Sequence, residues 1–192
     1  MATNKVLDQL THLTDEGGDG IIVERDFPLG SVKTTGGLTL TASTAPTIAA
    51  TESNGVAIVG AASTTALGTI LWGVPIDYDR TSDYLRVKVL CEMGGATDAT
   101  NTIDATVYRK RAGTALSADL NPTASAAIPA SASPTDDAAI RELILTGLSC
   151  RPGDALTINL LTAAHTTDAV NIWAVWIEYK SMIVARDITN RS

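Results

Sequence analysis

Polar and apolar residues alternate along several short runs of this chain, most clearly over residues 84–93. Alternation with a period of two residues is typical of a β-strand that buries one face. A second alternating run spans 103–110, and we expect it to pair with the first. The side chains expected to point inward are Leu85, Val87, Val89, Cys91, Met93, Ile103, Ala105 and Val107.

The last third of the chain carries the most informative pattern. Pro152-Gly153-Asp154 predicts a tight turn, because Pro fixes φ, Gly accepts a positive φ and Asp can bond its own backbone. Residues 155–160 then alternate, which predicts a half-buried strand. The final run, 170–179, is apolar on both faces, and such a strand is covered on both sides. Trp173 and Trp176 lie three positions apart in it, so a regular strand directs them to opposite faces.

About eight such runs are separated by turns rich in Gly, Pro and Asp, and no sustained helical period follows residue 26. The pattern predicts an all-β fold, an antiparallel β-sandwich with a jelly-roll-like order of strands. Residues 112–139, rich in Ala, Ser and Thr, are interpreted as a long loop that makes contacts. The runs lie at 38–41, 55–60, 69–75, 84–93, 103–110, 140–145, 155–160 and 170–179.

The N-terminal residues form a different kind of segment. Val6, Leu7, Leu10 and Leu13 make a weak helical stripe, which an acidic, Gly-rich turn at 15–20 ends. A single stripe cannot bury itself, so we expect an extended or partly helical arm that orders only on a neighbour.

We therefore divide the chain of 192 residues into an arm (1–26), one β-sandwich (27–182) and a C-terminal tail (183–192). Residues 21–24 are either the end of the arm or a first short strand.

The charge of the chain excludes some partners. Its net charge is −7 and its isoelectric point is about 4.7, so nucleic acid and anionic membrane surfaces are not expected partners. The start of the sequence lacks the apolar segment of a secretory signal, and no run of 18 apolar residues occurs. We expect synthesis in a host cytoplasm. Cys91 and Cys150 are interpreted as buried thiols, although the spacing leaves a disulfide open.

The sequence offers little catalytic chemistry. It has two histidines, His12 and His165, and we expect His165 to be an exposed loop residue. No nucleophile, nucleotide or paired-cysteine metal motif occurs, so we expect neither enzymatic activity nor a cofactor. Two sets of acidic residues leave a calcium site open as an alternative, since this ion takes several oxygen ligands. These groups are Asp15, Glu16 and Asp19 in the arm, and Asp77, Asp79 and Asp83 in a turn.

Arg109, Lys110 and Arg111 form the one basic cluster in the sequence, at the end of a predicted strand. We interpret it as a solvated strand end, with electrostatic docking on an acidic protein surface as the alternative. A second open question concerns the aromatic residues. If two or more of Trp72, Tyr78, Tyr84, Tyr108 and Trp173 line one exposed groove, a carbohydrate-binding module is favoured; if they are buried or at contacts between subunits, a structural role is favoured.

The order of these segments resembles the small structural proteins with which tailed bacteriophages decorate or cement the outer capsid. The likeness runs from Arg25-Asp26-Phe27-Pro28-Leu29 through the run Tyr84 to Val89, the loop Gly95 to Asn101 and the run Ile103 to Tyr108. It continues with Leu148, Pro152-Gly153-Asp154 and Leu156, and ends in the apolar final strand.

The resemblance implies a virion protein on the outer capsid surface that binds across subunits of a major capsid protein with the HK97-like fold. It also implies a homo-oligomer, with a trimer favoured, and no catalytic residues. A tail- or fibre-associated adsorption protein, or a carbohydrate-binding β-sandwich, is the alternative. The candidate interface residues are Val6, Leu7, Leu10, Leu13, Arg109, Lys110, Arg111, Trp173 and Trp176.

Overall fold

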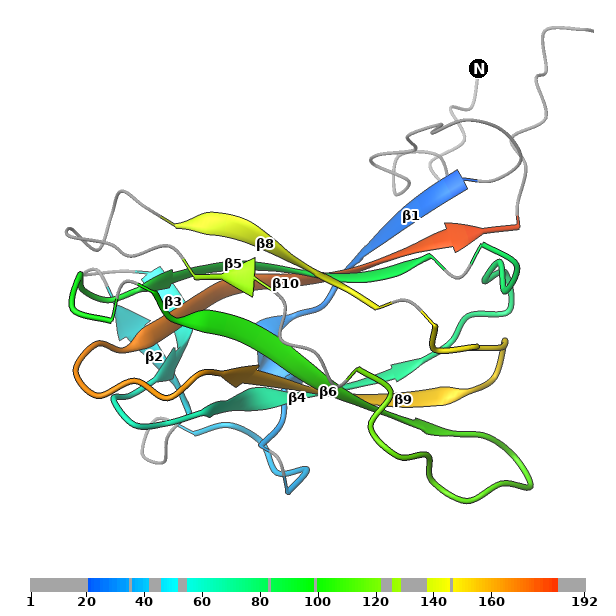
Figure 1. Ribbon diagram of the computed structural model, residues 1–192, viewed down its shortest axis with the longest axis horizontal. Helices are drawn as coiled ribbons and strands as arrows, with labels where there is room; N and C mark the ends of the chain where they lie inside the picture. The colour runs from blue at the N-terminus through cyan, green and yellow to red at the C-terminus, as the bar shows by residue number, and fades with distance from the viewer. Residues whose placement is uncertain are drawn as a thin grey trace, which may run out of the picture.

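The computed structural model shows a sandwich of two antiparallel β-sheets (Figure 1). It describes residues 21–34, 36–41, 46–51, 55–82, 84–98, 100–121, 126–128, 138–145 and 147–182. Within these ranges there are ten strands and one short 3₁₀ helix, η1. Their bounds are β1 (Ile21–Asp26), η1 (Leu29–Ser31), β2 (Thr47–Thr51), β3 (Gly55–Gly60), β4 (Ala66–Gly73), β5 (Leu85–Met93), β6 (Thr102–Lys110), β7 (Ala126–Ala127), β8 (Ala139–Ile144), β9 (Ala155–Thr162) and β10 (Val170–Ser181).

Strands β3 to β10 form a jelly roll. One sheet has the order β3-β10-β5-β8 and the other β4-β9-β6-β7, so the chain crosses repeatedly between the two layers. Strand β2 extends the first sheet beyond β3, and β1 pairs with the far half of β10, which gives that sheet six strands. The predicted β-sandwich with jelly-roll-like order is confirmed. Seven of the eight expected runs are strands, whereas 38–41 is not, because Thr39 makes only an isolated bridge to Lys33; β1, β2 and β7 are the additional strands.

The core lies between the two sheets and is built from the alternating side chains. All eight residues expected to point inward from the runs 84–93 and 103–110 are buried. Leu156, Ile158 and Leu160 of β9 face them, as the alternation in 155–160 predicts. Burial of these aliphatic side chains supplies the main stabilising free energy, at about 25 cal/mol per Å² of apolar surface. The two inner faces thereby hold the connecting loops at fixed positions at both ends of the sandwich.

The segment left open between arm and sandwich belongs to the sandwich. Ile21–Asp26 pairs along its whole length with β10, from Ile21 opposite Ser181 to Asp26 opposite Trp176. Residues 1–20 and 183–192 lie outside the described residues, as do Val6, Leu7, Leu10 and Leu13. The expected docking of the arm therefore stays a prediction.

Candidate binding surfaces

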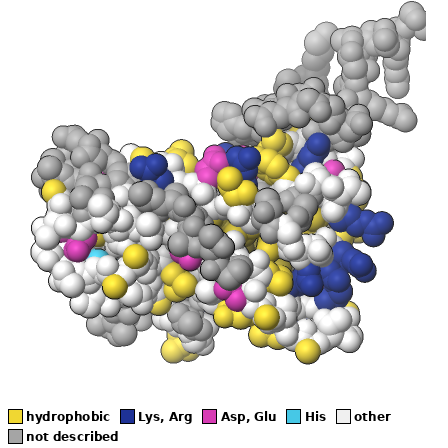
Figure 2. All heavy atoms as spheres, viewed as in Figure 1, with side chains coloured by type: hydrophobic (Ala, Val, Ile, Leu, Met, Phe, Trp, Pro, Cys, Tyr) yellow, Lys and Arg dark blue, Asp and Glu magenta, His cyan; other side chains and the backbone are white. Residues whose placement is uncertain are grey.

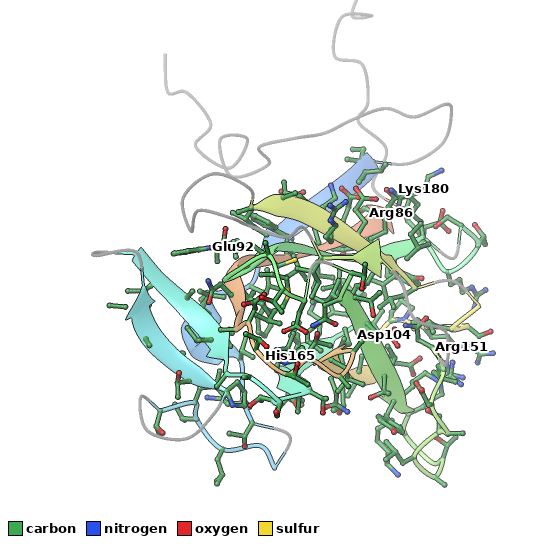
Figure 3. The ribbon with its side chains drawn as sticks, turned by 60° about the vertical axis from the view of Figure 1, so that its left-hand side comes forward. Arg86, Glu92, Asp104, Arg151, His165 and Lys180 are labelled. Atoms are coloured by element: carbon green, nitrogen blue, oxygen red, sulfur yellow. The ribbon has the colours of Figure 1, made fainter. Side chains whose placement is uncertain are left out.

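Strand β10 is central to the six-stranded sheet and determines what its outer surface presents. Val175, Ile177 and Tyr179 point toward the core and are buried, which leaves Trp176 and Glu178 on the other side. We call the side of this sheet turned away from the four-stranded sheet the outer face. Figure 3 labels Arg86 and Glu92 of β5 near opposite ends of the outer face.

A β-bulge brings Trp173 to the outer face. The register between β10 and β5 shifts between Ile172 and Ala174, so that Trp173 is the inserted residue. Its indole Nε1 donates a hydrogen bond of 3.0 Å to Glu92 Oε1, and Glu92 belongs to the outward-pointing residues of β5. The prediction that Trp173 and Trp176 face opposite sides is wrong, because the inserted residue breaks the alternation on which it rested.

Aliphatic side chains extend this apolar surface onto the neighbouring strands. Leu90 of β5 lies opposite Ile140 of β8, and Arg86 lies opposite Ile144. Ile140 is 55% exposed and Ile144 is 53% exposed. Because Ile140 and Ile144 share the outer face with the two tryptophans, this face is the candidate interaction surface.

Several charged residues of the outer face are joined in one network around Lys88. Lys88 Nζ lies 2.5 Å from Glu178 Oε2 and 3.2 Å from Glu24 Oε2, which links β5, β10 and β1. The Tyr84 hydroxyl donates to the other oxygen of Glu178. Burial alone lowers the pKa of Lys88, but its hydrogen bonds to Glu178 and Glu24 outweigh burial and raise it. Lys88 therefore stays charged, and the middle of the outer face is a paired network rather than a free charge.

Arg109 and Arg111 hold a loop in place at one end of the sandwich, which we call the arginine end. Arg109 Nη1 donates to the carbonyl oxygens of Leu148 and Ser149. Arg111 donates to Asp154 from Nε at 2.7 Å and from Nη2 at 2.6 Å. These guanidinium groups are engaged within the chain, so their assignment to a partner interface stays a prediction. Lys110 is exposed, and its Nζ donates to the Thr114 carbonyl.

The predicted turn at Pro152-Gly153-Asp154 is confirmed and buries its carboxylate. Gly153 has φ of +83°, which its missing side chain permits. Asp154 accepts the Arg151 backbone N–H at 2.9 Å in addition to Arg111. Burial raises the pKa of Asp154, but Arg111 and the Arg151 N–H outweigh it and hold that pKa below the ordinary value. Asp154 is thus a charged side chain that joins β6 to the connection between β8 and β9.

The opposite end of the sandwich is closed by His165, Asp98 and Asp168. His165 Nδ1 lies 2.7 Å from the Asp168 carbonyl oxygen, and Nε2 lies 2.9 Å from that of Thr64. Asp98 accepts the backbone N–H groups of Thr167 and Asp168, which lower its pKa, while Asp168 accepts those of Thr97 and Asp98. His165 is only 2% exposed, so the expectation of an exposed loop residue is wrong. Both ring nitrogens lie within hydrogen-bond distance of backbone carbonyl oxygens, and sequence spacing does not reveal these contacts.

Other candidate residues have structural partners. Cys91 and Cys150 are buried and are not in a disulfide, and burial raises the pKa of Cys91 to about 12. Asp77 accepts from the hydroxyls of Tyr179 and Ser181, whereas Asp79 accepts from Thr81. Asp83, together with Asp15, Glu16 and Asp19, lies outside the described residues. In the part of the chain that the structure describes, no three His, Cys, Asp or Glu side chains are grouped as a metal site requires.

The five aromatic residues that discriminate between glycan binding and a structural role do not share one groove. Tyr78 is buried, and Trp72 and Tyr78 pack against Tyr179 at ring-centroid distances of 5.9 Å and 6.2 Å. Tyr108 is on the outer side of the four-stranded sheet. Tyr84 precedes β5, and Trp173 reaches Glu92 eight positions along that strand, about 26 Å away at 3.3 Å per residue. Only Tyr78 of the five is buried, so neither outcome set out for these residues is met and the choice stays open.

Comparison with known proteins does not assign this chain to a family. No family model matches it, and no curated protein matches it. A solved xylan-binding module, CBM15, is similar in structure, with 8% sequence identity, coverage of 82% of this chain and 96% of that chain, and a TM-score of 0.44. A protein of unknown function from Shewanella oneidensis MR-1 is similar with 14% identity, coverage of 96% of both chains and a TM-score of 0.34. Among the described residues, no helix is long and apolar enough to cross a membrane.

Proposed function

We propose that this protein is a non-catalytic structural component of a bacteriophage virion that decorates the outer capsid surface. The outer face of the six-stranded sheet is the observation that carries the proposal. Trp173, Trp176, Ile140 and Ile144 lie on that face around the paired charges of Lys88 and Glu178. Buried aromatic anchors surrounded by polar contacts are what a specific protein interface requires.

The rigidity of the sandwich supports this function. Asp154 with Arg111 fixes the loops at one end, and His165 with Asp98 fixes those at the other. A surface that is ordered before binding loses little conformational entropy on docking, so a modest contact area yields useful affinity. We propose that the partner is a major capsid protein of the HK97-like fold and that the decoration protein acts as a homotrimer.

Co-sedimentation tests the proposal directly. The full-length protein is mixed with undecorated capsids of the same virus and pelleted, and the bound fraction is measured against protein concentration. We expect saturable binding with a fixed number of copies per capsid and an increase in the temperature at which the capsids disrupt. Absence from the pellet at micromolar concentration contradicts capsid decoration.

Self-association is tested separately. Light scattering of the free protein at micromolar concentration is expected to give a mass near three times the 19.9 kDa of one chain. A mass of one chain in solution, together with one or two copies at each binding position on the capsid, contradicts the trimer.

Carbohydrate binding is the second candidate, and one observation favours it. The bulge places Trp173 and Trp176 on the same face, roughly 10 Å apart along β10 at 3.3 Å per residue. Two tryptophan rings on one flat surface are able to stack against successive sugar rings. A glycan-array signal that is lost on Trp176→Ala substitution would support carbohydrate binding. If the protein also fails to bind capsids, carbohydrate binding is the function to adopt in place of decoration.

Removal of the arm is expected to separate binding from folding. Deletion of residues 1–20 leaves β1 and its pairing with β10 intact, so the thermal midpoint should change by less than about 2 °C. Capsid affinity should fall at least about tenfold, because the arm adds a second contact at high effective concentration. Circular dichroism melting and co-sedimentation of the two proteins, side by side, give both values. Equal affinity of the truncated and full-length proteins contradicts a role for the arm.

A further inference from the structure

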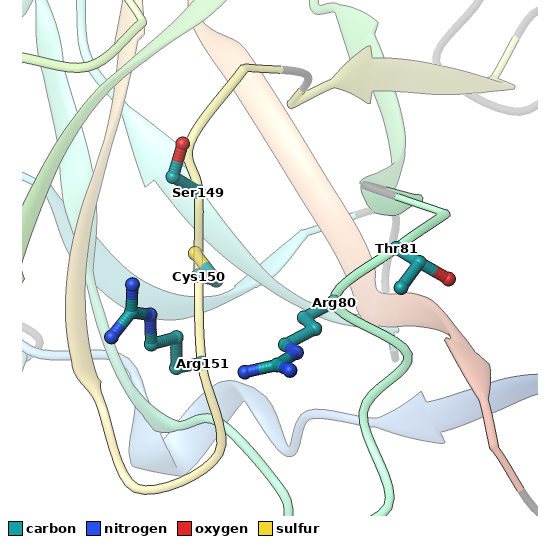
Figure 4. Close-up of a pocket in the computed structure, with 5 residues that line it drawn as sticks. All are labelled: Arg80, Thr81, Ser149, Cys150 and Arg151. Atoms are coloured by element: carbon teal, nitrogen blue, oxygen red, sulfur yellow. The ribbon is translucent and has the colours of Figure 1, made fainter.

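The arginine end contains a pocket that the proposed function does not use. It has a volume of about 390 Å³ and lies between the connection that follows β4 and the connection that precedes β9 (Figure 4). Its size falls within the range of ordinary ligand pockets, about 300–1,000 Å³. The residues that line it are Arg80, Thr81, Ser149, Cys150 and Arg151.

Two arginines that line this pocket have no side-chain partner among the described residues. The side chains of Arg80 and Arg151 make no hydrogen bond or ion pair with any described residue, whereas the nearby Arg111 is committed to Asp154. Figure 2 shows Lys and Arg side chains gathered at this end of a chain whose net charge is −7. The pocket is therefore a local positive region on an acidic protein.

The carboxylates close to the pocket are already engaged. Asp79 accepts the Thr81 backbone N–H at 2.8 Å and the Thr81 hydroxyl at 2.6 Å. Burial raises the pKa of Asp79, but the hydrogen bonds from Thr81 and Ser82 outweigh it and lower that pKa. Asp154 is neutralised by Arg111. Neither of these two carboxylates pairs with Arg80 or Arg151, so both exposed guanidinium groups are available to an anion from outside.

The wall of the pocket is held in a fixed shape. Ser149 has φ of +49°, an uncommon conformation for a residue with a side chain. Its carbonyl oxygen accepts from Arg109 and Arg111, each at 3.0 Å, and these bonds maintain that conformation. The loop continues into the turn in which the Val74 N–H donates to the backbone carbonyl oxygen of Asp154 at 2.8 Å. A ligand therefore meets an ordered wall and does not have to fold one.

From this geometry we infer that the pocket binds carboxylate side chains of an acidic polypeptide segment. The planar guanidinium forks of Arg80 and Arg151 match carboxylates, which they can hold through paired hydrogen bonds. None of the described residues that line the pocket is aromatic, so they offer a sugar ring no stacking surface. Ser149 and Thr81 also line the pocket, although the Thr81 hydroxyl already donates to Asp79.

Calorimetric titration with a capped hexaglutamate peptide tests the inference on the full-length protein. We expect measurable binding that weakens as salt increases from 50 to 300 mM, because screening shortens the range of the attraction. Arg80→Ala with Arg151→Ala should weaken binding at least about tenfold, since charge-assisted contacts are lost. Both side chains are exposed and make no hydrogen bond or ion pair with a described residue, so the double variant should melt at the same temperature as the natural chain.

Two comparisons isolate the pocket from general charge. Lys33→Ala with Lys110→Ala also removes two positive charges, but from residues outside the described pocket lining. This variant should leave peptide binding within about twofold. Arg80→Lys with Arg151→Lys keeps the charge and removes the forks, and should bind between the natural chain and the alanine variant. Equal peptide affinity of the alanine variant and the natural chain overturns the site. Tighter binding of an oligogalacturonate of equal charge overturns the assignment to a polypeptide.

Discussion

Asp154→Ala is expected to lower the free energy of unfolding by about 3 kcal/mol, because removal of one partner leaves the other charge uncompensated. Asp154 is 2% exposed and accepts both the Arg111 guanidinium and the Arg151 backbone N–H. Urea denaturation at pH 7 measures the difference. Asp104→Asn is the matched control: Asp104 is a half-buried carboxylate on β6 whose side chain accepts the adjacent Ala105 N–H, and its replacement should cost less than about 0.5 kcal/mol.

The stability contributed by Asp154 should depend on pH with a definite sign. Its pKa in the folded protein lies below the ordinary value of 3.8, because the Arg111 and Arg151 hydrogen bonds outweigh burial. Such a group stabilises the fold above about pH 4, and this contribution is lost as the pH falls through the lowered pKa. The difference in unfolding free energy between the natural chain and Asp154→Asn should therefore shrink at low pH. A difference that is constant between pH 7 and about pH 2.5 contradicts the ion pair as its source.

The regular strands could be predicted from the sequence because their burial depends on a local pattern. In β5 the alternation of Leu85, Val87 and Val89 with charged residues is sufficient to assign the inner side, and all three are buried. The same holds for β9, where Leu156 and Ile158 alternate with polar neighbours. In each of these strands one face is apolar and the other is polar, so only one orientation of the strand buries the apolar side chains. The buried face can therefore be predicted without knowledge of the partner strand.

The bulge in β10 could not be predicted, because its cause is not local. Residues 170–179 are apolar at almost every position, so either register of the two tryptophans satisfies the pattern. The inserted Trp173 is fixed by Glu92, which lies 81 positions earlier in the chain. A buried carboxylate on β5 that needs donors is a signal only once β5 and β10 are known to be neighbours.

The polar loops at both ends of the sandwich also depend on contacts between residues that are far apart in the sequence. Arg109 and Arg111 form a basic cluster in the sequence, but the carbonyl of Ser149 and the carboxylate of Asp154 engage them. His165 similarly depends on the Thr64 carbonyl, 101 positions away. The pocket of Arg80 and Arg151 combines two residues that sequence analysis did not single out, since each is an isolated charge in its own turn.

Replacement of both outer-face tryptophans should abolish most capsid binding. Truncation of a central aromatic anchor commonly costs 2 kcal/mol or more, so Trp173→Ala with Trp176→Ala should weaken co-sedimentation at least about hundredfold. Tyr108→Ala is the matched control, because it removes an aromatic ring from the outer side of the four-stranded sheet and should leave affinity nearly unchanged. If Tyr108→Ala loses binding while the double variant retains it, the four-stranded sheet is the docking surface instead.

Substitution of Trp173 and substitution of Trp176 should have different effects on the free energy of unfolding. Trp173→Ala removes the indole donor to the buried Glu92 and should lower the unfolding free energy by about 1–2 kcal/mol, whereas Trp176→Ala should change it less. Trp173→Phe keeps a flat ring but loses the donor, so it separates the two contributions. We expect Trp173→Phe to retain more capsid affinity than Trp173→Ala and to be equally destabilised by loss of the bond to Glu92. If affinity instead follows stability across these three variants, Trp173 acts by holding β10 in shape, and Trp176 is left as the anchor in direct contact with the capsid.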